Sequence, residues 1–303
     1  MLAVVIPYYK IKFFEECLES LATQTNNNFT VYIGDDASPD DPQPLIEKFR
    51  NSLNISYKKF QENIGGKSLV SHWDRCLELT GDEKWIMILG DDDYLGPQVV
   101  ERFYQELPVF EDLSNIVRFG TVTIDESSQA LSGKYEHPVW ETAPDSYFRR
   151  FTQQTRSSLS EYIFKRSAYE KFGFYNYPLG WFSDNKAWLD FAENKKIYSI
   201  NEAIVFIRSS ALNISGRTDN EKLKTEGQLQ FYDHLVTDRL NLFKKEERLK
   251  LIRYYEDRLR ENKRLSYIKL ISLLFLYGKN YEKEEFKKFI KRSIKNLFIY
   301  KNE

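Results

Sequence analysis

Short apolar runs alternate with amphipathic stretches along the first hundred residues of the chain. Residues 3–9, 29–33 and 85–89 are nearly continuous apolar runs, a pattern typical of strands that are buried on both faces. Residues 14–22 carry apolar or small side chains at helical spacing, and residues 69–79 form a second candidate helix. This alternation predicts a doubly wound α/β domain, in which ligands bind outside the carboxyl ends of the strands.

The alternation continues beyond residue 97 with less regular spacing. We expect a helix over residues 99–110, a strand over residues 116–124, and a strand followed by a short helix over residues 162–175. Residues 133–160 contain no long periodic segment. We therefore expect an irregular span there, of the kind in which substrate specificity is commonly built.

The composition changes at residue 221. From there to residue 303 the chain is rich in Lys, Glu, Leu and Tyr and nearly free of Gly and Pro, which predicts three or four helices. This part carries 21 Lys and Arg against 13 Asp and Glu, whereas residues 1–220 carry 23 against 32. The charge asymmetry predicts two functional parts, a domain of residues 1–220 and a helical C-terminal region of residues 221–303.

Residues 265–299 combine a broad apolar face with a row of lysines, and two interpretations remain open. The helices could pack on the catalytic domain or on another subunit, or they could form a basic amphipathic surface that lies on an anionic membrane. Nucleic-acid binding is not expected, because the apolar stripe lacks base-stacking motifs. The oligomeric state is not encoded in any pattern of the sequence.

The cysteines and the apolar runs indicate a cytoplasmic protein. Cys17 and Cys76 lie in apolar or amphipathic stretches, which argues against a disulfide framework and fits a reducing compartment. The N-terminal apolar run stops at Pro7 and lacks a basic segment before it, so we expect a first strand and not a signal peptide. The apolar run at residues 270–277 is too short to span a bilayer. Peripheral contact with the inner membrane face remains an alternative.

Carboxylates follow two of the predicted buried strands. Asp35 and Asp36 come after one of them, and Asp91, Asp92 and Asp93 come after another. Like charges at the end of a buried strand repel one another and resist desolvation, whereas Mg²⁺ or Mn²⁺ would favour them. Solvated acidic turns are the simpler interpretation of each group alone. There is no GxGxxG or GxxxxGK[ST] motif, so phosphate held through a metal ion is the hypothesis that remains.

Several motifs, taken in order, resemble the family 2 glycosyltransferases. The resemblance covers roughly residues 1–220 and lies in VVIPYYKIKFFEECLESLATQT, FTVYIGDDASPDD, NIGGKSLVSHWDRCLELTGDEKWIMILGDDDYLGP, GWFSDNKAWLDFA and IRSSALNIS. It implies the nucleotide-sugar-binding GT-A fold, a Rossmann-like mixed sheet flanked by helices. Residues 1–97 would form the nucleotide-binding half and residues 98–220 the acceptor half.

The resemblance also implies residues that would bind the donor. Tyr9 would stack on the nucleotide base, with Pro7 and Tyr8 lining the same wall. Asp36 would accept a hydrogen bond from the base, and Lys67 would lie near the ribose or the diphosphate. The family's A-R-N segment is replaced by SHWDRC here, so no arginine contact carries over from it.

The metal site follows from the same resemblance. The family's D-x-D element falls on Gly90, Asp91 and Asp92, so its first Asp is a glycine in this chain. Asp92 would be the principal ligand of Mn²⁺ or Mg²⁺, Asp91 would lie near the ribose or the metal shell, and Asp93 is an additional candidate ligand. Arg208 resembles the residue that closes the site near the diphosphate.

Asp184 opens a predicted helix and matches the acidic residue that acts as general base in the family. Such a base deprotonates the acceptor hydroxyl in an inverting transfer, which needs no protein nucleophile. The simpler interpretation is that Ser183 or Asp184 caps the helix. The histidines at 72, 137 and 234 lack partners at metal-ligand spacing and are expected to be structural or exposed.

We therefore expect a metal-dependent, inverting glycosyltransferase. It would transfer a hexosyl or N-acetylhexosaminyl group from a nucleotide-sugar, with UDP-sugars as the expected donors, to a saccharide or lipid-linked acceptor in cell-surface polysaccharide synthesis. Two alternatives remain, a nucleotidyltransferase and a catalytically inactive nucleotide- or sugar-binding module. The nucleotidyltransferase is disfavoured because IPYYKIKFF is not a glycine- and basic-rich phosphate loop.

Overall fold

The computed structural model describes residues 1–299, with side chains described as far as residue 294. The chain divides into two compact units, residues 1–227 and the residues from 228 onward. The division falls inside helix α8 (Glu221–His234), which begins at the first residue of the C-terminal region predicted from composition. Each unit is described separately below.

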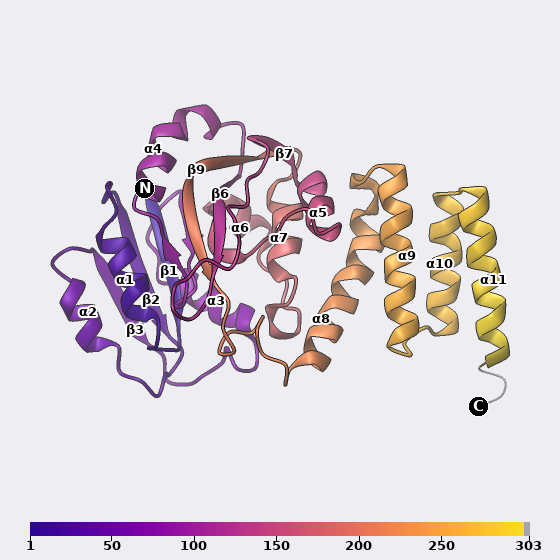
Figure 1. The fold of residues 1–303 in the computed structure, drawn as a ribbon, viewed down its shortest axis with the longest axis horizontal. Helices are drawn as coiled ribbons and strands as arrows, with labels where there is room; N and C mark the ends of the chain where they lie inside the picture. Colours follow the sequence, from indigo (N-terminus) through magenta and orange to yellow (C-terminus); the bar gives the residue numbers. More distant parts are fainter. Residues whose placement is uncertain (300–303) are drawn as a thin grey trace. The chain divides into compact units, whose positions relative to one another are not determined.

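A mixed sheet lies at the centre of the first unit, with helices on its faces (Figure 1). Within the described residues it has nine strands, ordered β3-β2-β1-β4-β8-β6-β9-β5, with β7 paired to β9. The strands are β1 (Leu2–Tyr8), β2 (Phe29–Asp35), β3 (Ile55–Lys59), β4 (Trp85–Ile88), β5 (Tyr94–Leu95), β6 (Ile116–Ile124), β7 (Trp140–Thr142), β8 (Tyr162–Lys165) and β9 (Lys196–Arg208).

The strand order explains where a ligand crevice forms. Strand β1 pairs in parallel with β2 on one side and with β4 on the other, so the chain reverses its direction of travel across the sheet after β3. The carboxyl ends of β1, β2 and β4 therefore lie at one edge, the usual position of ligands in open α/β sheets. The antiparallel partner β8 then connects this parallel half to β6 and β9.

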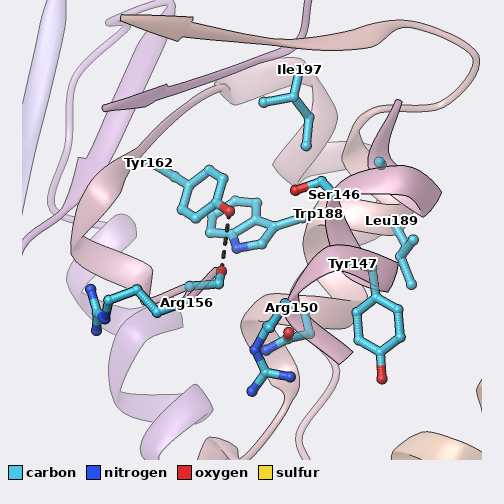
Figure 2. A pocket seen from close by; sticks show the side chains of 11 residues that line it. Ser146, Tyr147, Arg150, Arg156, Tyr162, Trp188, Leu189 and Ile197 are labelled. Carbon is cyan, nitrogen blue, oxygen red and sulfur yellow. Dashed lines mark hydrogen bonds between the residues drawn. The ribbon is translucent and has the colours of Figure 1, made fainter. Parts of the chain in front are cut away.

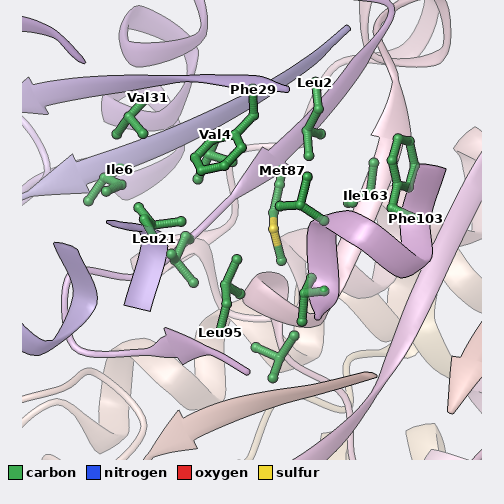
Figure 3. Packing of buried hydrophobic residues seen from close by; sticks show 14 of the residues in the cluster. Leu2, Val4, Ile6, Leu21, Phe29, Val31, Met87, Leu95, Phe103 and Ile163 are labelled. Carbon is green, nitrogen blue, oxygen red and sulfur yellow. The ribbon is translucent and has the colours of Figure 1, made fainter. Parts of the chain in front are cut away.

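Helices cover the sheet as the hydrophobic pattern predicts. In the first unit they are α1 (Phe14–Ala22), α2 (Gln43–Phe49), α3 (Leu69–Leu77), α4 (Val99–Phe110), α5 (Ala143–Phe151), α6 (Arg166–Phe172) and α7 (Ser183–Phe191), with the 3₁₀ turns η1 (Leu159–Glu161) and η2 (Pro178–Gly180). The core packs β1, β2 and β4 against α1 and α4. Figure 3 shows Val4, Val31 and Met87 from the strands beside Leu21 and Phe103 from these helices.

Part of the span predicted to be irregular is regular. Strand β7 pairs antiparallel with β9, and α5 follows it directly. Thr142 caps α5, since its hydroxyl oxygen accepts a hydrogen bond from the backbone N–H of Asp145 at 3.2 Å. The expectation of loop structure is therefore wrong for these residues, because pairing with β9 and the cap at Thr142 define them, and neither can be seen in the apolar pattern.

The second unit consists of helices. They are the end of α8, a π-helical turn η3 (Leu235–Arg239), a 3₁₀ turn η4 (Leu240–Leu242), α9 (Lys245–Glu261), α10 (Tyr267–Lys279) and α11 (Lys283–Ile299). Glu256 of α9 is fully buried and links the three long helices. Its carboxylate accepts hydrogen bonds from Tyr277 of α10 at 2.8 Å and from Arg292 of α11 at 2.7 Å. Within the described residues, no helix is long and apolar enough to span a bilayer.

Candidate active site

The ends of β1, β2 and β4 are joined by hydrogen bonds. The backbone N–H groups of Tyr9 and Lys10, just after β1, both donate to Asp91 Oδ2 at 2.8 Å. Ser38, after β2, donates its hydroxyl to the carbonyl oxygen of Tyr9 at 2.7 Å. The predicted donor-binding residues Tyr9 and Asp91 are therefore brought together, although they are far apart in the sequence.

Asp36 is buried and holds a loop against helix α3. Its carboxylate accepts hydrogen bonds from the backbone N–H groups of Ile64 and Gly65, both at 2.9 Å, and from the guanidinium of Arg75. Burial raises the pKa of Asp36, and these donors oppose that shift. A Cβ at position 65 would lie 2.5 Å from Asp36 Oδ2, which explains the glycine. The role of Asp36 as acceptor for a nucleotide base stays a prediction.

Arg75 is a site residue that the sequence did not reveal. Its guanidinium lies 3.9 Å from the centroid of the Phe60 ring and reaches Asp36 from helix α3. It belongs to the SHWDRC segment, which departs from the family pattern. The sequence does show an arginine on a predicted helix. Its partner, Asp36, lies 39 residues away along the chain, so no local pattern connects the two.

The residues at the end of β1 face in different directions. Tyr9 is 38 % exposed and Pro7 is partly buried, so both can line a nucleotide site. Tyr8 is 0 % exposed, and its ring packs 4.5 Å from that of Phe14 in the core. The prediction that Tyr8 lines the same wall is corrected here, because successive side chains of a strand point to opposite faces. Lys67 is exposed in the loop before α3.

The three carboxylates after β4 have different partners. Asp93 is buried, and its two oxygens accept hydrogen bonds from the backbone N–H of Arg208 at 2.8 Å and from the hydroxyl of Ser160 at 2.6 Å. Asp91 is held by the backbone after β1, as described above. Asp92 is partly exposed, and its carboxylate accepts a hydrogen bond from the side chain of Asn213. Burial, together with the charge of Asp92, raises the pKa of Asp91 and of Asp93.

This arrangement fits a loosely coordinated Mg²⁺ or Mn²⁺. Such ions often bind through one or two carboxylates together with substrate phosphates and waters, and Asp92 offers the least engaged oxygens. A Cβ at position 90 would lie 3.0 Å from Asp92 Oδ1 and 3.1 Å from Asp93 Oδ2, so the glycine leaves space beside both carboxylates. No cluster of three metal-ligating side chains is found among the described residues, so a cation would depend on the substrate for its other ligands.

Arg208 lies beside the carboxylates, but its guanidinium is already engaged. It is 2 % exposed, and it donates to the carbonyl oxygen of Asp92 at 2.9 Å and to that of Asp125 at 2.8 Å. It also forms an ion pair with Glu16 and lies 4.3 Å from the centroid of the Phe13 ring. Arg208 therefore positions the end of β4, and a direct contact with a diphosphate would require these bonds to be exchanged.

Asp184 lies in the first turn of α7 and does not cap it. The N-cap residue is Phe182, which has a left-handed backbone with φ of 71°, and no side chain caps the helix. The interpretation that Ser183 or Asp184 is only a cap is therefore wrong. Asn185 donates to Asp184 Oδ1 at 2.6 Å. Burial raises the pKa of Asp184 and the nearby Arg150 opposes the shift, which suits a carboxylate that must accept a proton.

A small pocket beside α7, with room for about one water molecule, is lined by the rings of Tyr162 and Trp188 (Figure 2). It lies between α5, α7 and the start of β8, and Asn185, the hydrogen-bond partner of Asp184, is part of its wall. Arg150 and Arg156 contribute guanidinium groups, and Tyr162 and Trp188 contribute rings.

Comparison with known proteins places the chain in a family. The family described as glycosyl transferase family 2 matches residues 3–177. The chain is 24 % identical to glycosyltransferase GlyG of Streptococcus pneumoniae over 241 residues, which are 78 % of this chain and 77 % of that protein. It is 30 % identical over 103 residues to the poly(ribitol-phosphate) β-N-acetylglucosaminyltransferase TarS of Staphylococcus aureus, which are 33 % of this chain and 17 % of TarS.

A solved structure supports the fold independently. The crystal structure of S. aureus TarS residues 1–349 in complex with UDP-GlcNAc is similar to this one with a TM-score of 0.63 at 14 % identity, covering 92 % of this chain and 80 % of that one. The predicted mixed α/β fold with C-terminal helices is thereby confirmed. Since the family match spans more than half of the chain, the protein belongs to glycosyl transferase family 2 and is a glycosyltransferase with the GT-A fold.

Proposed function

We propose that the protein transfers a sugar, with inversion and with the help of a divalent cation, from a UDP-sugar to a hydroxyl group of a saccharide or lipid-linked acceptor in cell-surface polysaccharide synthesis. The observation that carries the proposal is Asp184. It is a partly buried carboxylate in the first turn of α7, it does not cap its helix, and its pKa is raised. These are the properties expected of a general base that works near neutral pH.

A UDP-sugar is the donor we favour, with N-acetylglucosamine as the first candidate sugar. TarS has been crystallised in complex with UDP-GlcNAc and with UDP, and its fold is similar to that of this chain. The exposed ring of Tyr9 offers a stacking surface for a base at the end of β1. Lys67, exposed in the loop that Asp36 holds in place, can reach toward the ribose or the phosphates.

The transfer is a single displacement. Asp184 takes the proton of the acceptor hydroxyl while its oxygen forms a bond to C1 of the donor sugar. The bond between C1 and the diphosphate oxygen breaks on the opposite face, and the nucleoside diphosphate leaves with the electron pair. One base and no protein nucleophile are needed, and the configuration at C1 inverts.

A cation at Asp92 would neutralise negative charge on the leaving diphosphate. Asp92 would hold it, with Asp93 as a further candidate and Asp91 positioned by the backbone of Tyr9 and Lys10. Asp93 is the weaker candidate, because Ser160 and Arg208 already donate to both of its oxygens.

The variant Asp184→Asn tests the proposed function. We expect it to retain UDP-GlcNAc binding, measured by calorimetry, and to lose about 10²- to 10⁴-fold of the transfer rate, because the amide cannot accept the proton. Asp112→Asn, the same change on an exposed residue after α4, serves as the control and should leave the rate unchanged. A variant that transfers sugar at the wild-type rate would remove Asp184 from the mechanism.

We further propose that the second unit contacts a membrane through α10. This helix exposes an apolar face, whose large members are Tyr267, Ile268, Ile271, Leu274 and Phe275. An apolar face was predicted over residues 265–299, and its part on α11 is less exposed. Phe289 of α11 is buried and stacks on Tyr277, with ring centroids 4.5 Å apart. The side chains of Lys295, Leu297 and Phe298 lie outside the described residues. An exposed apolar face on a basic segment suits an anionic bilayer, where a lipid-linked acceptor would be found.

A further inference from the structure

The segment that follows β9 lies against the carboxylates after β4. Residues 209–217 contain no helix or strand, and Asn213 holds them in a turn. The side-chain oxygen of Asn213 accepts a hydrogen bond from the backbone N–H of Gly216 at 2.9 Å, and its nitrogen donates to the carbonyl oxygen of Arg208 at 2.7 Å. The same side chain also donates to the carboxylate of Asp92, so the segment touches the proposed cation ligand directly.

Lys10 fastens this segment from the end of β1. Its ammonium donates to the carbonyl oxygen of Leu212, the residue before Asn213. Its backbone N–H donates to Asp91 Oδ2 at 2.8 Å, so Lys10 joins the segment to the carboxylates. Burial raises the pKa of Asp92, and the charge of Lys10 opposes the rise. Lys10 therefore acts as a counter-ion inside the empty site.

The ammonium and the side-chain amide both oppose a divalent cation at Asp92. Mg²⁺ and Mn²⁺ take oxygen ligands, and the N–H that Asn213 presents to the carboxylate cannot serve as one. Two positive charges beside one carboxylate repel each other, so the ammonium of Lys10 and a bound cation compete for Asp92. The simpler interpretation is that Lys10 only balances the charge of the carboxylates. That interpretation predicts that the segment stays in place when a cation binds.

We propose that Lys10 and Asn213 occupy Asp92 in the ligand-free protein, and that a divalent cation binds Asp92 only when these two groups release it. The inference rests on the proposed function, because it concerns the cation site of that function. Exchange of the two contacts costs free energy, so a cation alone binds weakly. The diphosphate of a nucleotide-sugar brings negative charge that balances the ammonium, so the cation binds well together with the donor.

The variant Lys10→Met tests the competition. We expect it to bind Mn²⁺ without nucleotide about tenfold more tightly than the wild-type protein, because a like charge beside the cation is removed. Lys10→Arg keeps the charge and should bind Mn²⁺ as weakly as the wild type. Lys12→Met is the matched control, since Lys12 pairs with the exposed Glu126 at 2.5 Å, and it should change the affinity less than about twofold. Electron paramagnetic resonance of the free ion measures these affinities without turnover.

Hydrogen exchange of the wild-type protein tests the release of the segment and needs no variant. The backbone N–H groups of Gly216 and Arg217 both donate to Asn213. If the segment leaves Asp92, these amides should exchange faster, so saturating Mn²⁺ without nucleotide should speed exchange in residues 209–217. Residues 55–59 of β3 serve as the internal control and should not respond.

The inference and the proposed function fail in different ways. The inference is overturned if Lys10→Met binds Mn²⁺ no more tightly than Lys12→Met, or if Mn²⁺ leaves exchange in residues 209–217 unchanged or slows it. The proposed cation site stands in both cases, provided that the wild-type protein binds Mn²⁺ when UDP is present. If the wild-type protein binds no Mn²⁺ even with UDP, the cation leaves the proposed function, and the inference is overturned with it.

Discussion

At the scale of single residues, the four carboxylates of the site differ in what surrounds them. Asp91 and Asp93 accept hydrogen bonds from the protein, so they fix the ends of β1, β4 and β9 in place. Asp92 is less engaged, and Asp184 lies in the first turn of a helix that it does not cap. The same chemical group therefore serves as a structural acceptor in two positions and is available for chemistry in the other two.

This difference predicts opposite effects of two neighbouring variants. Asp92→Asn should abolish the rise in melting temperature that UDP and Mn²⁺ produce together, because a ligand bound only to the native state stabilises it by mass action. The melting temperature of Asp92→Asn without ligand should change little, because the substitution removes a partly exposed charge that is repelled by Asp91 and Asp93. Asp93→Asn should instead lower the melting temperature of the free protein, because an amide offers one accepting oxygen in place of two, so that Ser160 or Arg208 loses its acceptor. Thermal unfolding with and without UDP and Mn²⁺ measures both, and a Mn²⁺-dependent rise that persists in Asp92→Asn would exclude it as the principal ligand.

The sequence located the residues at strand ends better than the directions of their side chains. Motif order placed Tyr9, Asp91 and Asp92 at one edge, and the structure brings them together. The motif order could not place Tyr8 in the core, because a strand that is buried on both faces lacks the alternation of apolar and polar residues that would distinguish its two sides. Arg75 was missed because its partner, Asp36, is distant in the sequence and no local pattern connects them.

At the scale of elements, segments with an apolar pattern of their own were predicted well, and segments defined by distant partners were not. Helix α4 and the strand–helix pair β8–α6 occur where the apolar pattern places them. Strand β7 and helix α5 were missed, since their stability comes from pairing with β9 and from a cap at Thr142. In the second unit, helix content was predicted, but the inward direction of Glu256 was not, because one Glu among many in a Lys- and Glu-rich helix carries no distinguishing signal.

Glu256 predicts how the helices of the second unit respond to acid. Burial raises its pKa, but hydrogen bonds from Arg292 and Tyr277 outweigh burial, so the pKa lies below its usual value in the folded state. Its contribution to stability is therefore present above the unfolded pKa of about 4.5 and is lost as the pH falls through the lower, folded pKa. Glu256→Gln should lower the free energy of opening of these helices at pH 7 by about 3 kcal/mol, because three arginines lose a buried partner.

Native-state hydrogen exchange of the amides in α9, α10 and α11 measures this free energy without assuming that the whole chain unfolds in one step. The loss should shrink as the pH is lowered toward 3, where the wild-type carboxylate also begins to take up a proton. Glu284→Gln on α11, which removes an exposed partner of Lys287, is the control and should change the free energy by less than about 1 kcal/mol. Equal effects of the two variants would show that Glu256 does not hold the helices together.

At the scale of the whole molecule, charge and apolar surface are divided between the two parts of the chain. Residues 1–220 are net negative, whereas residues 221–303 are net positive and include the exposed apolar face of α10. An anionic surface would repel the first part and attract the second. Any membrane contact should therefore depend on the helical part and should weaken with salt.

Flotation with vesicles tests this expectation. The full-length protein should bind vesicles that contain about one-third anionic lipid, release from them as the salt concentration rises, and bind neutral vesicles much less. Replacing Ile268 and Phe275 with Ser should reduce binding on the order of tenfold or more, because two exposed apolar side chains no longer enter the interface. Leu113→Ser with Leu131→Ser removes comparable exposed side chains from the first unit and should have no effect. If the Ile268 and Phe275 variant instead changes the sedimentation of the protein and leaves vesicle binding intact, the α10 face contacts another subunit, and the membrane proposal fails.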